Sequence, residues 1–178
     1  MEQLSEGQCK WFALRVRTRC ENLVKRALQD KGYTTFLAAY HDGQVENPYF
    51  PGYLFAQFNP FARLPVLTTP HVLHIVSFGR GPAEILPNQI DGLRKLVASG
   101  VPPIQCPYYH EGSRVRVVGG PMQGVEGIVL RHHQSTRLVI SVDILMRSVA
   151  VEIDPKFVRA IGGGGQMRPL DNRVSKLA

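Results

Sequence analysis

The chain has 178 residues, of which 44% are hydrophobic and 20% charged, close to the averages of globular proteins. A chain of this length forms one domain or two small ones. No apolar run approaches the roughly 20 residues that a membrane-spanning helix requires, and the first residues are too acidic and polar for a secretory signal. We therefore expect a cytoplasmic protein with no membrane segment.

Positive charge exceeds negative charge: 21 Lys and Arg against 14 Asp and Glu give a formal net charge of +7. Such an excess favours an anionic partner, nucleic acid above all, because each neutralised phosphate releases condensed counterions. The same charge is equally compatible with a soluble protein that happens to be basic. Net charge alone leaves both interpretations open.

The residue types of catalytic and metal sites show no functional spacing. Cys9, Cys20 and Cys106 are odd in number and far apart, which predicts neither disulfides nor a zinc site. His132 and His133 are adjacent, so on a strand they would point to opposite faces, without a carboxylate or cysteine at ligand spacing. The sequence also lacks a Gly-x-x-x-x-Gly-Lys-Ser/Thr nucleotide loop. We expect no enzyme activity, no metal and no cofactor.

The first predicted elements are a strand over residues 11–16 and a helix over residues 20–31. Alternation along the strand predicts one face in the core, with Phe12, Leu14 and Val16, and one face outside it, with Ala13, Arg15 and Arg17. In the helix, Gly32 follows the last turn where a C-cap residue would stand. The helix has apolar residues at helical spacing: Leu23, Val24, Ala27 and Leu28.

A second strand is predicted over residues 33–40, followed by a polar loop over residues 41–46 and a turn centred on Pro51 and Gly52. Proline presets the first corner of a type II turn, and glycine accepts the positive φ of the second. Both faces of the strand after the turn are largely apolar: Tyr53, Phe55 and Gln57 share one, and Leu54, Ala56 and Phe58 the other.

Residues 71–78 predict a further strand, and residues 88–97, after Pro87, predict a second helix. Strands mixed with helices on a modest sheet indicate an α+β domain. Residues 99–109 contain too much proline for a helix or a central strand and indicate an interdomain linker.

Helical spacing disappears in the second half of the chain. Short β-branched runs between glycines and polar turns predict a small all-β barrel of about 50 residues, near the lower size limit for independent folding. These runs lie within residues 115–117, 128–129, 138–142, 149–153 and 158–161. The segment 162–178 begins with four glycines and continues as polar sequence, which predicts a flexible tail.

Three blocks resemble the NusG family, in the family's order: Trp11-Phe12, residues 49–58 with Phe50-Pro51-Gly52-Tyr53, and residues 112–121 with the sequence GSRVRVVGGP. Residues 124–129 resemble the KOW motif, and residues 149–161 the last strands of the KOW barrel. The resemblance implies an α+β NGN domain with an antiparallel sheet and flanking helices at 9–99. It further implies a linker at 100–110, an all-β KOW domain at 111–161 and a tail at 162–178.

The resemblance implies a monomeric transcription elongation and antitermination factor. In the family, the NGN domain binds the clamp helices of RNA polymerase, bridges the cleft over the nucleic acid and suppresses pausing. One sheet face suffices for the core of an α+β domain, so a second aromatic face is available for docking. The alternative is that the same side chains pack under the two helices. By match to the family pattern, the polymerase-binding residues are Tyr53, Phe55, Phe78, Ile90 and Leu93.

A nucleic-acid contact is predicted at the end of the first strand. If the strand extended to Arg19, the side chains of Arg15, Arg17 and Arg19 would project to one side, an arrangement suited to phosphates. Arg17 matches a basic position of specialised family members that read the non-template DNA strand, so non-template or upstream DNA is the expected partner. A solvated basic face is the alternative.

A partner contact is predicted for Ile144, Leu145 and Met146 in the barrel. In the family, this loop meets a small-subunit ribosomal protein or the termination factor Rho. The family often has an aromatic residue and glycine where this chain has Leu145 and Met146. An apolar loop tip suggests a binding site, and the alternative is that it folds back onto the barrel.

Other features resemble the specialised RfaH-like and UpxY-like members more than housekeeping NusG: Asn59-Pro60 and residues 78–83 (FGRGPA). The His-Thr-Thr motif of RfaH is not recognisable around residues 63–65. Glycines around residues 119–127 disfavour a helical form of the second domain. Two alternatives remain beside an operon-specific factor: a housekeeping NusG, or a ribosome-associated or RNA-binding KOW module.

Overall fold

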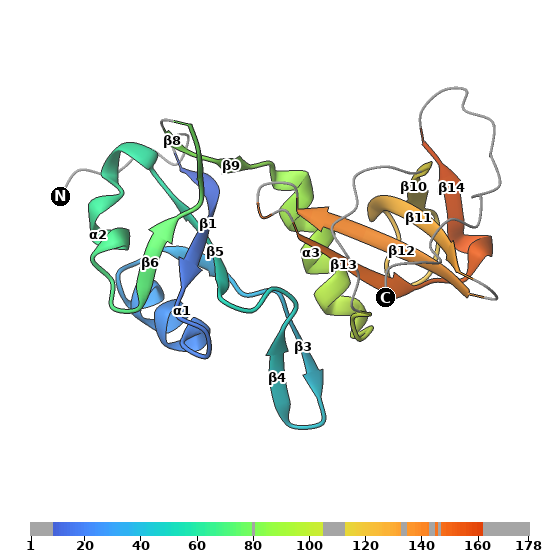
Figure 1. Cartoon of the computed structure of the whole chain (residues 1–178), viewed down its shortest axis with the longest axis horizontal. Helices are drawn as coiled ribbons and strands as arrows, with labels where there is room; N and C mark the ends of the chain where they lie inside the picture. Colours follow the sequence, from blue (N-terminus) through green and yellow to red (C-terminus); the bar gives the residue numbers. More distant parts are fainter. Residues whose placement is uncertain are drawn as a thin grey trace, which may run out of the picture.

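The computed structural model describes residues 9–79, 81–104, 113–132, 135–142, 145 and 147–161. Two five-stranded antiparallel sheets lie at the two ends of the described molecule, with the helix α3 (Pro87–Ser99) between them (Figure 1). We call them the N-terminal sheet and the C-terminal sheet. This mixed architecture with few helices agrees with the predicted fold class at that level.

The N-terminal sheet has the strand order β2-β5-β1-β6, and β9 pairs with the other end of β1. Its strands are β1 (Lys10–Val16), β2 (Thr34–Phe36), β5 (Tyr53–Phe58), β6 (Val72–Ile75) and β9 (Glu84–Ile85). Strands β1 and β5 are antiparallel, with Ala13 opposite Phe55 and Arg15 opposite Tyr53. Because paired residues project to the same face, this register determines which side chains of the two strands meet.

One face of the N-terminal sheet packs against α1 (Glu21–Asp30) and α2 (Leu64–Leu67). The helix α1 lies where periodicity predicted it, and Gly32 follows it with a φ of +85°. The short helix α2 and the turn η2 (Pro60–Ala62) before it were not predicted. The buried cluster on this face includes Phe12, Leu14, Val16, Val24, Leu28, Leu54, Ala56, Phe58 and Val66.

The opposite face is also buried, so the prediction that only one face of the first strand lies in the core is wrong. Trp11 and Ala13 are 8% and 0% exposed and belong to a second cluster with Phe55. The rest of that cluster comes from α3, from the C-terminal half and from further residues of the N-terminal half, among them Tyr49, Phe50 and Ile85. Alternation in the sequence could not reveal this, because the covering side chains come from distant segments.

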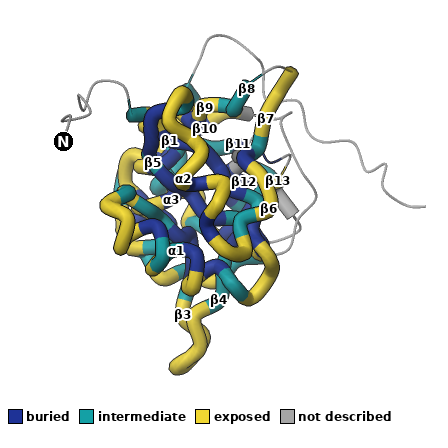
Figure 2. The backbone as a smooth tube through the Cα atoms, turned by 90° about the vertical axis from the view of Figure 1, so that its left-hand side faces the viewer, coloured by how far each residue is buried: buried dark blue, intermediate teal, exposed yellow. Residues whose placement is uncertain are grey.

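Two hairpins extend from the N-terminal sheet. The predicted strand over residues 33–40 is instead split into β2 and β3 (Ala39–Asp42), and the predicted polar loop is part of a hairpin of β3 with β4 (Val45–Pro48). Gly43, at φ +61°, makes its turn. A second, shorter hairpin joins β7 (Ser77–Phe78) to β8 (Gly81–Pro82). The β3–β4 hairpin projects from the molecule, and its tip and β7 are exposed (Figures 1 and 2).

The C-terminal sheet has the order β13-β12-β11-β10-β14. All five strands overlap the predicted β-branched runs: β10 (Ser113–Val117), β11 (Glu126–His132), β12 (Ser135–Val142), β13 (Arg147–Glu152) and β14 (Val158–Ala160). The turn η4 (Pro155–Phe157) precedes β14. Before the sheet, Gly100 caps the C-terminal end of α3 with φ +65°, and the Ile104 N–H donates to the Ala150 carbonyl over 2.7 Å. None of the helices described is long and apolar enough to cross a membrane.

Candidate functional site

The turn before β5 holds Tyr53 in place. Gly52 has a φ of +79°, as a type II turn requires, and the Tyr53 N–H donates to the Phe50 carbonyl over 3.1 Å. The Gly52 N–H donates to Oε1 of Glu21 over 2.7 Å, and Glu21 is only 5% exposed. The first residue of α1 thus fixes the turn through a charge-assisted hydrogen bond.

Arg15 packs on the same turn. Its guanidinium carbon lies 4.8 Å from the centre of the Tyr53 ring, a cation–π contact. Its Nη1 donates to the carbonyls of Pro51 and Gly52 over 3.2 and 3.3 Å. Arg15 therefore orients Tyr53 instead of extending freely into solvent.

The predicted row of three arginines does not form as a single row. Strand β1 ends at Val16, and Arg19 adopts a left-handed backbone with φ 69° just before α1 begins. Arg17 and Arg19 are exposed, whereas Arg15 is half-buried on Tyr53. The predicted extension of the strand to Arg19 is wrong, because the chain turns after Val16 to begin α1.

Two residues that the sequence did not single out lie beside these arginines. His71 and His74 are exposed at the edge strand β6, the Arg17 N–H donates to the His71 carbonyl over 2.9 Å, and His74 pairs with Arg15. His71 has a left-handed φ of 68°, so two of the basic residues here hold a backbone that side chains disfavour. One feature of the sequence indicated that these histidines lie in a basic region: no Asp or Glu occurs from residue 47 to residue 83.

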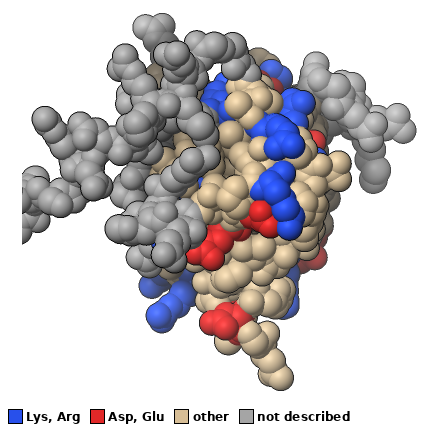
Figure 3. Space-filling view, turned by 90° about the vertical axis from the view of Figure 1, so that its right-hand side faces the viewer, with Lys and Arg blue, Asp and Glu red and all other residues tan. Residues whose placement is uncertain are grey.

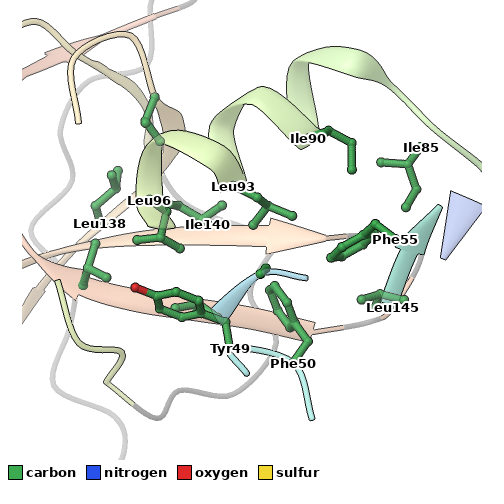
Figure 4. Packing of buried hydrophobic residues seen from close by; sticks show 14 of the residues in the cluster. Tyr49, Phe50, Phe55, Ile85, Ile90, Leu93, Leu96, Leu138, Ile140 and Leu145 are labelled. Atoms are coloured by element: carbon green, nitrogen blue, oxygen red, sulfur yellow. The ribbon is translucent and has the colours of Figure 1, made fainter. Parts of the chain in front are cut away.

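Three of the five predicted polymerase-binding residues lie together in the second cluster. Phe55 is 1% exposed, and Ile90 and Leu93 are 0% exposed. They pack with Leu138, Ile140 and Leu145 of the C-terminal half, between α3 and the C-terminal sheet (Figure 4). Half-buried Tyr53 packs at the border of the cluster, whereas Phe78 lies apart on β7 and is 62% exposed.

The two sheets also make contact at the border of this cluster. The guanidinium carbon of Arg147, on β13, lies 5.5 Å from the centre of the Tyr53 ring. On α3, Lys95 Nζ lies against Gly124 of the C-terminal half, 2.7 Å from where a Cβ would be. We call this packing of the C-terminal sheet against α3 and Phe55 the closed arrangement.

Of the three residues predicted to bind a partner of the barrel, Leu145 is 7% exposed and belongs to the same cluster as Phe55. Ile144 and Met146 lie outside the described residues. Leu145 is thus buried in a cluster to which both halves of the chain contribute.

Tyr49 connects the N-terminal sheet to the chain that follows α3. Its hydroxyl donates to the Val101 carbonyl over 2.6 Å. Burial, with a smaller effect of neighbouring Tyr40, raises the pKa of Tyr49 to about 12. The neutral phenol is therefore favoured in the folded protein.

Within the described ranges, the structure brings together no group of three His, Cys, Asp or Glu side chains that could hold a metal ion. Cys9 and Cys20 are free thiols, and Cys106 and His133 lie outside those ranges. The features that remain are the apolar cluster around Phe55 and the basic edge around Arg17.

Comparisons with known proteins agree on one family. Residues 9–94 match the family model described as "Transcription termination factor nusG". The "Transcription termination/antitermination protein NusG" of Synechocystis sp. is 26% identical over 182 residues, covering 84% of this chain and 87% of that protein. The protein of the same name from Pseudomonas aeruginosa is 31% identical over 114 residues, covering 61% of this chain and 64% of that protein.

A solved structure supports the same fold. The structure described as "Domain interaction in Thermotoga maritima NusG" matches with a TM-score of 0.57 and 18% identity. The match covers 88% of this chain and 99% of that one. At this identity, the similarity concerns the fold.

Proposed function

We propose that this chain, whose residues 9–94 match the NusG family model, is a transcription elongation and antitermination factor that binds RNA polymerase. The proposed docking surface is the apolar face of the N-terminal sheet and α3, with Tyr53, Phe55, Ile90 and Leu93. Phe78 is a separate exposed contact. The clamp helices of polymerase are the expected partner.

The observation that carries this proposal is how the two sheet faces are covered. Helices α1 and α2, which belong to the N-terminal half, bury one face. The face with Phe55 shares its cluster with the C-terminal sheet, which is a separate set of strands. Such a face can be uncovered without unfolding the N-terminal sheet. An apolar face of this kind suits a protein partner.

Docking requires the closed arrangement to open. Phe55, Ile90 and Leu93 are at most 1% exposed, so polymerase can reach them only when the C-terminal sheet moves away. We propose that residues 9–99 are an NGN domain and residues 111–161 a KOW domain, with 100–110 as linker and 162–178 as a flexible tail. Two domains joined by a linker can move apart, so the C-terminal sheet can leave the face that it covers.

The proposed nucleic-acid contact is the basic edge of the N-terminal sheet. Arg17 and Arg19 are exposed there, with His71 and His74 beside them. The guanidinium groups of Arg17 and Arg19 suit the phosphates of non-template or upstream DNA. Arg15 contributes to this edge mainly by holding Tyr53.

The C-terminal domain is proposed to bind a small-subunit ribosomal protein or Rho through Ile144, Leu145 and Met146. Leu145 lies in the covered cluster, so this contact also needs the open arrangement. We further propose that the factor serves particular operons, from its sequence resemblance to RfaH-like and UpxY-like members. RNA sequencing of a deletion strain should then show few affected operons, and a genome-wide effect would favour a housekeeping role.

Binding to purified RNA polymerase tests the proposal. Tyr53→Ala should weaken binding about tenfold or more, because buried aromatic anchors dominate interface energy. Leu23→Ala is the control. Leu23 is 57% exposed and belongs to α1, the helix that covers the other face of the N-terminal sheet. Phe55→Ala is a second variant, used if thermal unfolding shows that it folds. Wild-type affinity of a folded Tyr53→Ala variant would refute the docking surface.

A further inference from the structure

Two arginines from different sheets meet at one aromatic ring. The guanidinium carbons of Arg15 and Arg147 lie 4.8 and 5.5 Å from the centre of the Tyr53 ring. The two cations are thus at most about 10 Å apart, comparable with the Debye length at 0.1 M salt. The closed arrangement therefore concentrates positive charge at the border between the sheets.

Among the residues that the structure describes, no carboxylate forms an ion pair with Arg15 or Arg147. The ion pairs found there are Lys10–Glu84, Arg94–Asp91, Arg116–Glu126 and Lys156–Asp154. The carboxylate of Glu21 lies on the turn that Arg15 also contacts, where its Oε1 accepts a hydrogen bond from the Gly52 N–H. By contrast, the end of the molecule formed by the C-terminal sheet carries basic and acidic side chains next to one another (Figure 3).

The positive charge continues beyond Arg15 along the N-terminal sheet. Arg17 and Arg19 follow Arg15 in the chain and are exposed, and Arg147 is also exposed. Arg15 uses Nη1 for the two turn carbonyls, and its other N–H donors remain available. Proteins that bind single strands commonly use a series of basic side chains to follow the phosphodiester backbone.

We infer that the closed arrangement binds the phosphodiester backbone of a single-stranded nucleic acid, with Arg147 as a contact from the C-terminal sheet. The strand runs from Arg19 and Arg17 past Arg15 to Arg147. This inference rests on the proposed nucleic-acid contact of Arg17 and Arg19. It adds to that contact a residue from the other sheet and a role for the closed arrangement.

Fluorescence anisotropy with labelled oligothymidylate and oligouridylate, over a series of salt concentrations, tests this inference on the full chain. Arg147→Ala should raise Kd about fivefold at 0.1 M salt. The slope of log Kd against log salt should fall by about 0.7, the value for one phosphate contact to a single strand. If Arg147→Ala weakens binding of oligothymidylate alone, the ligand is DNA, and if it weakens binding of oligouridylate alone, the ligand is RNA.

Arg159→Ala is the matched control, because Arg159 is an exposed arginine of the same sheet, on β14. It should leave Kd and the salt slope unchanged. Equal behaviour of Arg147→Ala and Arg159→Ala would overturn the inference. If Arg17→Ala weakens binding and Arg147→Ala does not, the proposed contact of Arg17 stands and this inference fails. If only Arg147→Ala weakens binding, Arg147 contacts the nucleic acid but the path past Arg17 is wrong, so both the proposed contact of Arg17 and this inference are overturned.

Discussion

The Oε1 atom of Glu21 accepts a hydrogen bond from the backbone N–H of Gly52 over 2.7 Å. This buried contact joins the start of α1 to the turn that presents Tyr53. Arg15 holds the same turn through the carbonyls of Pro51 and Gly52. The position of Tyr53, the central residue of the proposed docking surface, therefore depends on residues that need not touch polymerase.

Glu21→Ala should lower the free energy of unfolding by about 2 kcal/mol, because it leaves the Gly52 N–H buried without an acceptor. Glu21→Gln should cost about half as much, since an amide oxygen still accepts but carries no charge. Urea unfolding measures both. Equal stability of the two variants would show that the hydrogen bond contributes little.

Gly52→Ala should destabilise the protein by about 3 kcal/mol, through strain at positive φ and through collision of the new Cβ with Arg15 Nη1. Gly43→Ala is the control, since Gly43 also has a positive φ but open space around it. It should cost about 1 kcal/mol. Thermal unfolding of the two variants compares them, and similar losses would contradict the steric part of the argument.

Local patterns in the sequence predicted much of the fold. The apolar period of α1, the Pro51-Gly52 turn and the alternation along β5 depend on neighbouring residues, and all three agree with the structure. The helix α2 escaped prediction because four residues with a proline are too few for a helical period. The β3–β4 hairpin escaped because its sequence is mostly polar.

The candidate site was less predictable, because it depends on contacts between distant segments. Tyr53 and Phe55 were identified, but their cover by Leu138, Ile140 and Leu145 required the folded structure. His71 and His74 reach the arginine edge only through the pairing of β1 with β6. No periodicity within either segment encodes that pairing.

Tyr49 should make stability depend on pH in the alkaline range. Its pKa is raised from 10.0 to about 12 in the folded protein. The contribution of the neutral Tyr49 phenol to the free energy of unfolding is therefore complete below about pH 10 and is lost as the pH rises towards about 12. Urea unfolding across this range should show a steeper loss for the wild type than for Tyr49→Phe. Parallel curves would contradict the role of the phenol.

Leu145→Asp should open the closed arrangement, because an ionised carboxylate is unfavourable in an apolar cluster. The radius of gyration from small-angle X-ray scattering should increase, and the affinity for polymerase should rise about threefold or more as the docking surface is freed. Val118→Asp is the control, since Val118 is 43% exposed in the same half. A folded Leu145→Asp variant with wild-type scattering and affinity would contradict the proposed opening.

Photo-cross-linking from position 53 tests most directly whether the N-terminal sheet docks on RNA polymerase. The photoreactive residue p-benzoylphenylalanine would replace Tyr53 in one variant and Leu23, on α1, in another. We expect cross-links to the polymerase clamp from position 53 and none from position 23. Cross-links from position 23 but none from position 53 would contradict this expectation.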